Sequence, residues 1–171
     1  GEFREGSNFI QKNLFTLDGL DNADCSRVEI PVGVKVIGRN AFDYKTKIEE
    51  IIIPNTVTTI EDYAFTWCKS LKSIVIPNSV TRIGAYSFSN CANLESVVLS
   101  ENIDEIPEYC FYSCPKLKEI NIPNKVRIIN KSVFRDCYEL ENVSIPNTVK
   151  MIYSCAFNGT KFGKEVGIFK V

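Results

Sequence analysis

The sequence predicts a repeat solenoid that is rich in short β-strands and contains short helical or 3-10 turns. The first observation is spacing, because six of the eleven phenylalanines recur every 23 residues. The second is composition: 20 Ile and 15 Val stand against eight Leu, and β-branched residues favour strands. The third is the size of the repeat, since a unit this short cannot bury its own apolar face and must stack on its neighbours.

Other residue types recur with the same period. Each unit reads Leu-x-x-Ile-x-Ile-Pro-x-x-Val-x-x-Ile, then four variable residues, then Phe-x-x-Cys. The Phe row comprises Phe42, Phe65, Phe88, Phe111, Phe134 and Phe157. The Cys row comprises Cys68, Cys91, Cys114 and Cys137. Rows that agree over so many cycles predict one stacked array across most of the chain.

Each unit is expected to contribute one short strand to a parallel sheet. In the Ile-x-Ile segment the first and third side chains point to the same buried face. The proline that follows has no N–H and ends the pairing at the same place in each coil. We expect the first strand at Val28 and Ile30 and the last at Val166 and Ile168, about seven strands in all. The Val-x-x-Ile segment should begin the return arc, and the segment around Phe should form the short turn.

The rows divide the chain into an array and two ends. Residues 1–24 are interpreted as a vector remnant, Gly-Glu-Phe, followed by an N-terminal cap. Residues 25–162 form the array of 23-residue units. The pattern then degrades, because Thr160 stands in the Cys row and Gly163 in the Leu row. Residues 163–171 are therefore predicted to be a final degraded repeat strand or a C-terminal cap.

The composition argues against most catalytic and metal-dependent functions. The chain has no histidine, which removes the commonest general base and every histidine-containing metal site. Its formal charge of −1 predicts no basic surface for nucleic acid or an anionic membrane. The seven cysteines include no Cys-x-x-Cys pair, and all fit buried positions as small apolar residues. We therefore expect free thiols, no cofactor and no metal.

The repeat resembles the BspA-like class of leucine-rich repeats. Units such as 71–91 (LKSIVIPNSVTRIGAYSFSNC) and 140–157 (LENVSIPNTVKMIYSCAF) carry its pattern, and the resemblance covers roughly residues 25–168. It implies a right-handed arc with a parallel sheet on the concave side. Similar proteins are surface or secreted proteins of bacteria and protists that bind host proteins or partner cells. The sequence departs from the pattern at Ser100, which stands in the Pro row, and at the additional Pro107 and Pro115.

The residues that flank the buried strand positions predict a protein-binding surface on the concave face. The row between the buried positions contains three successive β-branched residues, Ile52, Val75 and Val98, followed by Asn121. The neighbouring row supplies the rest of the predicted site: Glu50, Ser73, Ser96 and Glu119. An apolar strip beside small serines is typical of an interaction surface. The alternative is that β-branched residues here only favour strands and pack along the ladder.

Two further rows run along the array. Tyr63, Tyr86 and Tyr109 share one phase, with Trp67 close by, and form a secondary aromatic patch. This patch could stack on sugars or on a partner's apolar side chains, or it could shield the Phe row. The other row alternates in sign and is interpreted as structural, because like charges in register would repel. It comprises Glu49, Lys72, Glu95, Lys118, Glu141 and Lys164.

The sequence thus predicts a non-enzymatic protein-binding module, and the resemblance places it at the cell surface or among secreted adhesion proteins. Its partner would be a protein, such as a host or extracellular-matrix protein. An intracellular, cytoplasmic interaction scaffold is the alternative, because the cysteines are odd in number and no export signal is recognisable. An enzyme is the third hypothesis. We expect no nucleic acid partner and no membrane insertion, since no apolar run reaches transmembrane length. The oligomeric state stays open.

Overall fold

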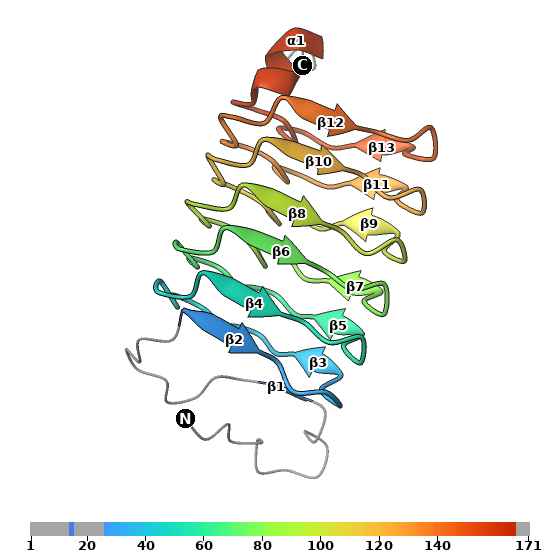
Figure 1. Ribbon diagram of the computed structural model, residues 1–171. Helices are drawn as coiled ribbons and strands as arrows, with labels where there is room; N and C mark the ends of the chain where they lie inside the picture. The colour runs from blue at the N-terminus through green and yellow to red at the C-terminus, as the bar shows by residue number, and fades with distance from the viewer. Residues whose placement is uncertain (1–13, 16–25, 167–171) are drawn as a thin grey trace.

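The stack of coils that the repeat predicts is present along the chain (Figure 1). The structure is a computed structural model that describes residues 14–15 and 26–166. Successive coils lie on one another along a single axis, from the blue N-terminal coils to the red C-terminal end. The architecture confirms the predicted β-rich solenoid with little helix.

Six three-residue strands form the sheet that the Ile-x-Ile pattern predicts. They are β2 (Arg27–Glu29), β4 (Glu50–Ile52), β6 (Ser73–Val75), β8 (Ser96–Val98), β10 (Glu119–Asn121) and β12 (Asn142–Ser144). Pairing is parallel, and partners are one repeat apart, as Ser73 is from Ser96. Ladder pairing joins β2 to β4, β6 to β8 and β10 to β12, whereas the contacts between β4 and β6 and between β8 and β10 carry no ladder.

A second parallel ladder runs through the Val-x-x-Ile segments, where the sequence analysis expected only a return arc. Its strands are β1 (Leu14–Phe15), β3 (Val36–Ile37), β5 (Thr59–Ile60), β7 (Arg82–Ile83), β9 (Glu105–Ile106), β11 (Ile128–Ile129) and β13 (Met151–Ile152). This ladder breaks between β7 and β9. In other coils the residue after the isoleucine donates its N–H to the previous coil, as Gly84 does to the carbonyl of Ile60 at 2.8 Å. Pro107 holds that position after β9 and has no N–H to donate to Ile83.

The seventh strand predicted at Val166 and Ile168 is wrong at Val166, which ends helix α1 (Lys161–Val166). Ile168 lies outside the described residues. Thr160 explains why the chain turns into a helix here, because its Oγ1 accepts the N–H of Gly163 at 2.8 Å, as an N-cap does. The same hydroxyl donates to the carbonyl of Phe157 at 2.7 Å. The residue that breaks the Cys row is therefore the start signal of this helix.

The segment around each Phe links neighbouring coils through the backbone. It contains short turns closed by i→i+3 hydrogen bonds, such as that from the N–H of Cys68 to the carbonyl of Phe65 at 3.3 Å. In the same coil the N–H groups of Tyr63, Phe65 and Trp67 donate to carbonyls of the next coil at 2.7 to 3.0 Å. Equivalent triplets of bonds centre on Phe42, Phe88, Phe111 and Phe134.

These turns hold unusual backbone conformations. Apart from Gly159, whose φ is 83°, the residues two before and two after each Phe have φ between 54° and 63°, the left-handed region that disfavours side chains. They are Asn40, Tyr44, Tyr63, Trp67, Tyr86, Asn90, Tyr109, Ser113, Ser132, Asp136 and Cys155. Each such residue costs about 1 kcal/mol or more. The hydrogen bonds between coils offset this cost, so the turns depend on the stacking of the whole array.

The centre of each coil is filled by its phenylalanine. The rings of the Phe row stack along the axis with centroids 5.0 to 5.6 Å apart and are almost fully buried. Neighbouring planes deviate by 19° or less. The repeat spacing places each ring over the next, so one continuous aromatic stack replaces the separate cores that single units could not form.

The Cys row lies beside this stack and is buried. Each Sγ of this row donates to the carbonyl of the Phe in the previous coil, as Cys68 does to Phe42 at 3.2 Å and Cys114 to Phe88 at 3.1 Å. Burial raises the pKa of Cys68 and of Cys110 to about 12. The thiols of Cys68 and Cys110 therefore stay protonated at neutral pH and pack as small groups in the core.

The expectation that all seven cysteines are buried is wrong for Cys155, which is exposed. Cys155 stands two residues before Phe157, in the phase of the tyrosine row, and not in the small slot directly before Phe that Cys110 fills. Cys25 lies outside the described residues. The described cysteines, five buried and one exposed, are all free, as the sequence predicted.

We predict that Phe88→Ala lowers the free energy of unfolding by about 3–5 kcal/mol, because it removes a ring that stacks on both Phe65 and Phe111. Urea titration followed by circular dichroism measures the change. Tyr138→Ala is the control, since Tyr138 is exposed and its truncation should alter stability by no more than about 0.5 kcal/mol. Equal effects of the two substitutions would contradict the role of the Phe stack.

A second prediction concerns the thiols. In a Cys25→Ser variant at about pH 8, one thiol, Cys155, should react rapidly with a chromogenic disulfide reagent, and five more should react only in denaturant. The buried thiols are shielded from the reagent, and the raised pKa of Cys68 and Cys110 keeps these two protonated at that pH. Rapid reaction of further thiols in the native protein would show that the Cys row is accessible.

Candidate functional site

The outward side chains of β2, β4, β6, β8, β10 and β12 form one continuous surface, which we call the open face. In β4, β6 and β8 the central residue is buried and both neighbours are exposed, as the period of two predicts. Ile52, Val75 and Val98 are 38%, 60% and 57% exposed. These three residues, the apolar strip, therefore lie on the surface where the sequence placed them. Exposure of successive β-branched residues at this level is unusual enough to mark a candidate interaction surface.

The other predicted residues lie on the open face beside the apolar strip. Val75 is directly opposite Val98, and Ser73 is opposite Ser96. Glu119 and Asn121 lie on β10, opposite Asn142 and Ser144 of β12. All of these polar residues are exposed. The face therefore changes along the axis from an apolar middle to a polar C-terminal end.

Glu50, a residue of the predicted site, is already paired with a cation of the neighbouring strand. Its Oε2 accepts a hydrogen bond from Nε of Arg27 at 2.9 Å. Arg27 also forms an ion pair with Glu29 at 2.7 Å. The single guanidinium of Arg27 thus contacts both carboxylates at the N-terminal end of the open face.

The charged row forms ion pairs at the two places where the strands lack a ladder. Lys72 pairs with Glu49 at 2.6 Å between the coils of β4 and β6, and Lys118 pairs with Glu95 at 3.1 Å between those of β8 and β10. The hydrogen bond that Lys72 donates to the carboxylate of Glu49 raises the pKa of Lys72. These exposed pairs support the structural interpretation of the row, although each contributes little stability.

The end of the charged row differs from the prediction. Glu141 pairs with Lys161 at 3.4 Å, and not with Lys164 as the alternation of signs suggested. The reason is helix α1, which takes the place of the strand on which Lys164 would have been in register.

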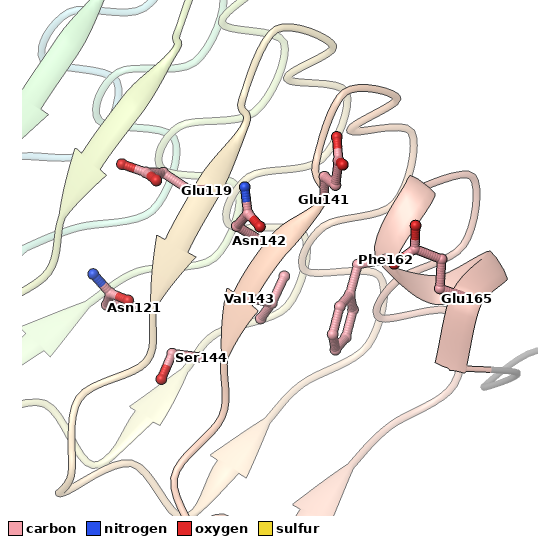
Figure 2. Close-up of a pocket in the computed structure, with 8 residues that line it drawn as sticks. All are labelled: Glu119, Asn121, Glu141, Asn142, Val143, Ser144, Phe162 and Glu165. Atoms are coloured by element: carbon pink, nitrogen blue, oxygen red, sulfur yellow. The ribbon is translucent and has the colours of Figure 1, made fainter.

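A hollow of about 400 Å³ lies where the open face meets helix α1 (Figure 2). Its lining comes from β10, from β12 with the residue before it, and from α1, and comprises Glu119, Asn121, Glu141, Asn142, Val143, Ser144, Phe162 and Glu165. The polar side chains of the two strands line one side, and Phe162 and Glu165 of the helix line the other. Two residues of the predicted site, Glu119 and Asn121, are thus brought together with residues that the sequence did not assign to it.

Helix α1 is held firmly as a wall of this hollow. The N–H of Phe162 donates to the carbonyl of Leu140 at 2.9 Å. The ring of Phe162 packs edge-on against that of Phe157 with centroids 5.1 Å apart, so Phe162 closes the end of the Phe stack. The sequence analysis missed Phe162 and Glu165 because it extended the strand pattern through this segment. Thr160, a preferred N-cap residue that breaks the Cys row, was the signal that could have shown a helix.

The secondary aromatic patch is divided into two stacks. Tyr63, Tyr86 and Tyr109 stack on one another with centroids 4.9 and 4.5 Å apart, and they are half-buried. Burial and the neighbouring tyrosines raise the pKa of Tyr86. Trp67 instead stacks on Tyr44 at 5.5 Å. Because these ring faces largely cover one another, the patch offers mainly ring edges to a ligand.

The described residues provide no arrangement suited to a metal ion, since no group of three or more Cys, Asp or Glu side chains is placed to hold one. Helix α1 has six residues, and the described part of the chain contains no helix that is long and apolar enough to cross a membrane. What the site offers is an extended surface with one apolar and one acidic region.

Comparisons with known proteins agree with the architecture. Residues 35–163 match the BspA type leucine rich repeat region in six copies. A leucine-rich repeat protein from T. pallidum is 27% identical with a TM-score of 0.81, and the match covers 99% of this chain and 94% of that protein. A leucine-rich repeat protein from Bacteroides ovatus is 31% identical with a TM-score of 0.64, over 80% of this chain and 41% of that protein.

A further structure shows the fold alone. A leucine-rich repeat protein from Eubacterium ventriosum is 24% identical with a TM-score of 0.76, over 86% of this chain and 46% of that protein. The chain thus spans less than half the length of the Bacteroides and Eubacterium proteins. No curated protein matches the sequence. Because the family match covers most of the chain and the structure has the same repeating coil, this chain belongs to the BspA-type leucine-rich repeat family.

Proposed function

We propose that this chain is a non-enzymatic protein-binding module that uses the open face of its sheet. One observation carries the proposal: the apolar strip is exposed in the middle of that face, while the equivalent residues on the inner side of each strand are buried. Exposed valines and isoleucine gain free energy when a partner covers them, at about 25 cal/mol per Å² of apolar surface. The polar residues beside the strip would supply orientation.

The proposed setting is a cell surface or secreted adhesion protein whose partner is a host or extracellular-matrix protein. Membership of the BspA-type family supports this setting. The histidine-free sequence lacks the commonest general base, and the proposal assigns no catalytic residue.

An intracellular interaction scaffold is the second candidate, and a specific observation favours it. The six described cysteines are free, and free thiols persist most readily in a reducing compartment. Both candidates use the same open face, so they differ in location and partner and not in the binding surface.

Location can be tested directly in the source organism. If the protein is displayed at the surface, a membrane-impermeant biotin ester applied to intact cells should label exposed lysines such as Lys72 and Lys118. Labelling only after the cells are lysed, with a cytoplasmic protein as the reference, would support the intracellular scaffold.

The binding surface can be tested with a randomised, display-encoded peptide library selected on the immobilised protein. We predict that Val75→Lys combined with Val98→Lys weakens binding of the selected peptides by about tenfold or more, because the substitutions put two cations into an apolar contact. Affinity is measured by fluorescence anisotropy with labelled synthetic peptides.

Val32→Lys is the matched control, since Val32 is an exposed valine outside the open face. It should leave binding unchanged, and circular dichroism should show that all variants remain folded. Peptides that bind the double variant as tightly as the unaltered protein would rule out the apolar strip as the binding surface.

A further inference from the structure

We propose that the open face binds an extended peptide segment with a basic side chain, arginine above all, in the hollow beside helix α1 and with apolar side chains on the strip. This inference rests on the proposed function and specifies the chemistry of its partner. The occupant is a protein segment in extended conformation, because the charge and the shape of the open face favour such a ligand.

The charges of the hollow are unbalanced. Three carboxylates line it, those of Glu119, Glu141 and Glu165. Lys161 pairs with Glu141 at 3.4 Å, whereas Glu119 and Glu165 have no cation partner among the described residues. Elsewhere on the face the carboxylates of Glu29 and Glu50 are paired with Arg27, and those of Glu49 and Glu95 with lysines. Among the described residues of the face, the two carboxylates without a cation partner, Glu119 and Glu165, therefore both line the hollow.

The hollow also suits the apolar part of a long basic side chain. Phe162 and Val143, both half-buried, line it beside the carboxylates. A guanidinium group is planar, stacks on aromatic rings and forms paired hydrogen bonds with carboxylates. Phe162 is fixed by its hydrogen bond to Leu140 and by its contact with Phe157, so the wall is in place before a ligand arrives.

The distance between the two regions sets the spacing of the ligand. Neighbouring coils are about 4.8 Å apart, and the hollow begins one coil beyond Val98, on β10. A side chain in the hollow would thus lie about 5–10 Å from the strip. An extended peptide advances about 3.3 Å per residue. The basic residue should therefore follow or precede the apolar anchor by two or three positions.

The experiment uses the peptides selected from the display library. We expect enrichment of arginine or lysine two or three positions from a Val, Ile or Leu. For a selected peptide, replacing the arginine with citrulline, a neutral residue of nearly the same shape, should weaken binding about tenfold at low salt, and added salt should reduce the difference.

Two protein variants locate the charge effect. Glu119→Gln with Glu165→Gln should weaken the arginine peptide about tenfold and leave the citrulline peptide nearly unchanged. Glu101→Gln with Glu108→Gln, which removes the same charge at exposed positions outside the hollow, should affect neither peptide.

Three results would overturn the inference: a library that yields no binder, binders without a basic residue, or equal affinity for the arginine and citrulline peptides. If only the valine substitutions weaken binding, the apolar strip binds the partner and the basic anchor is wrong; if neither set does, the proposed function itself is wrong.

Discussion

Interactions between coils join a residue to its counterpart one repeat further along, and the rest of the structure depends on this register. Backbone pairing does so between Ser73 and Ser96, ring stacking between Phe65 and Phe88, and an ion pair between Glu49 and Lys72. An insertion of one residue in a coil would displace all of these contacts together. The left-handed residues that flank Phe42, Phe65, Phe88, Phe111 and Phe134 donate backbone hydrogen bonds to the next coil, so local conformation and stacking are one cooperative system.

The same register separates the residues that pack inside the coils from those that face outward. The Phe row, the Cys row and the inner strand residues occupy the interior, and this leaves the outward strand residues free to vary. Where the backbone ladder is missing between coils, lysine and glutamate side chains join them instead, at Lys72–Glu49 and Lys118–Glu95. The charged row thus supports alignment at the edge of the open face, and the residues beside it, including Val75 and Val98, are not needed for that task. This is why their exposure favours a binding role over a structural one.

The sequence was sufficient for what repetition determines and insufficient where repetition ends. Periodic spacing predicted the Ile-x-Ile strands, the stacking of the coils and the exposure of Ile52, because each pattern was repeated in several coils. The second ladder was missed because each of its strands has only two residues, too few to show an alternation of buried and exposed positions. Pro107 interrupts this ladder because it lacks the N–H that the other coils donate. Helix α1 was missed because Val166 stands in the phase of the strand row, although Thr160 and Gly163 mark the break in the pattern. Cys155 was misplaced because a shift of one residue separates the buried slot directly before Phe from the position of the half-buried tyrosine row.

Repetition also limits what a binding surface can recognise. Identical rows present a partner with nearly the same chemistry at every coil, so the strip of Ile52, Val75 and Val98 can provide affinity but defines neither direction nor position along the axis. The break in the pattern at Thr160 changes this. It introduces α1, which turns the end of the face into a hollow with Phe162 and two unpaired carboxylates. A ligand that places a cation there has one orientation and one register, since no other described part of the face combines an aromatic wall with unpaired acidic groups. Specificity would then arise from the one place where the array departs from its own repeat.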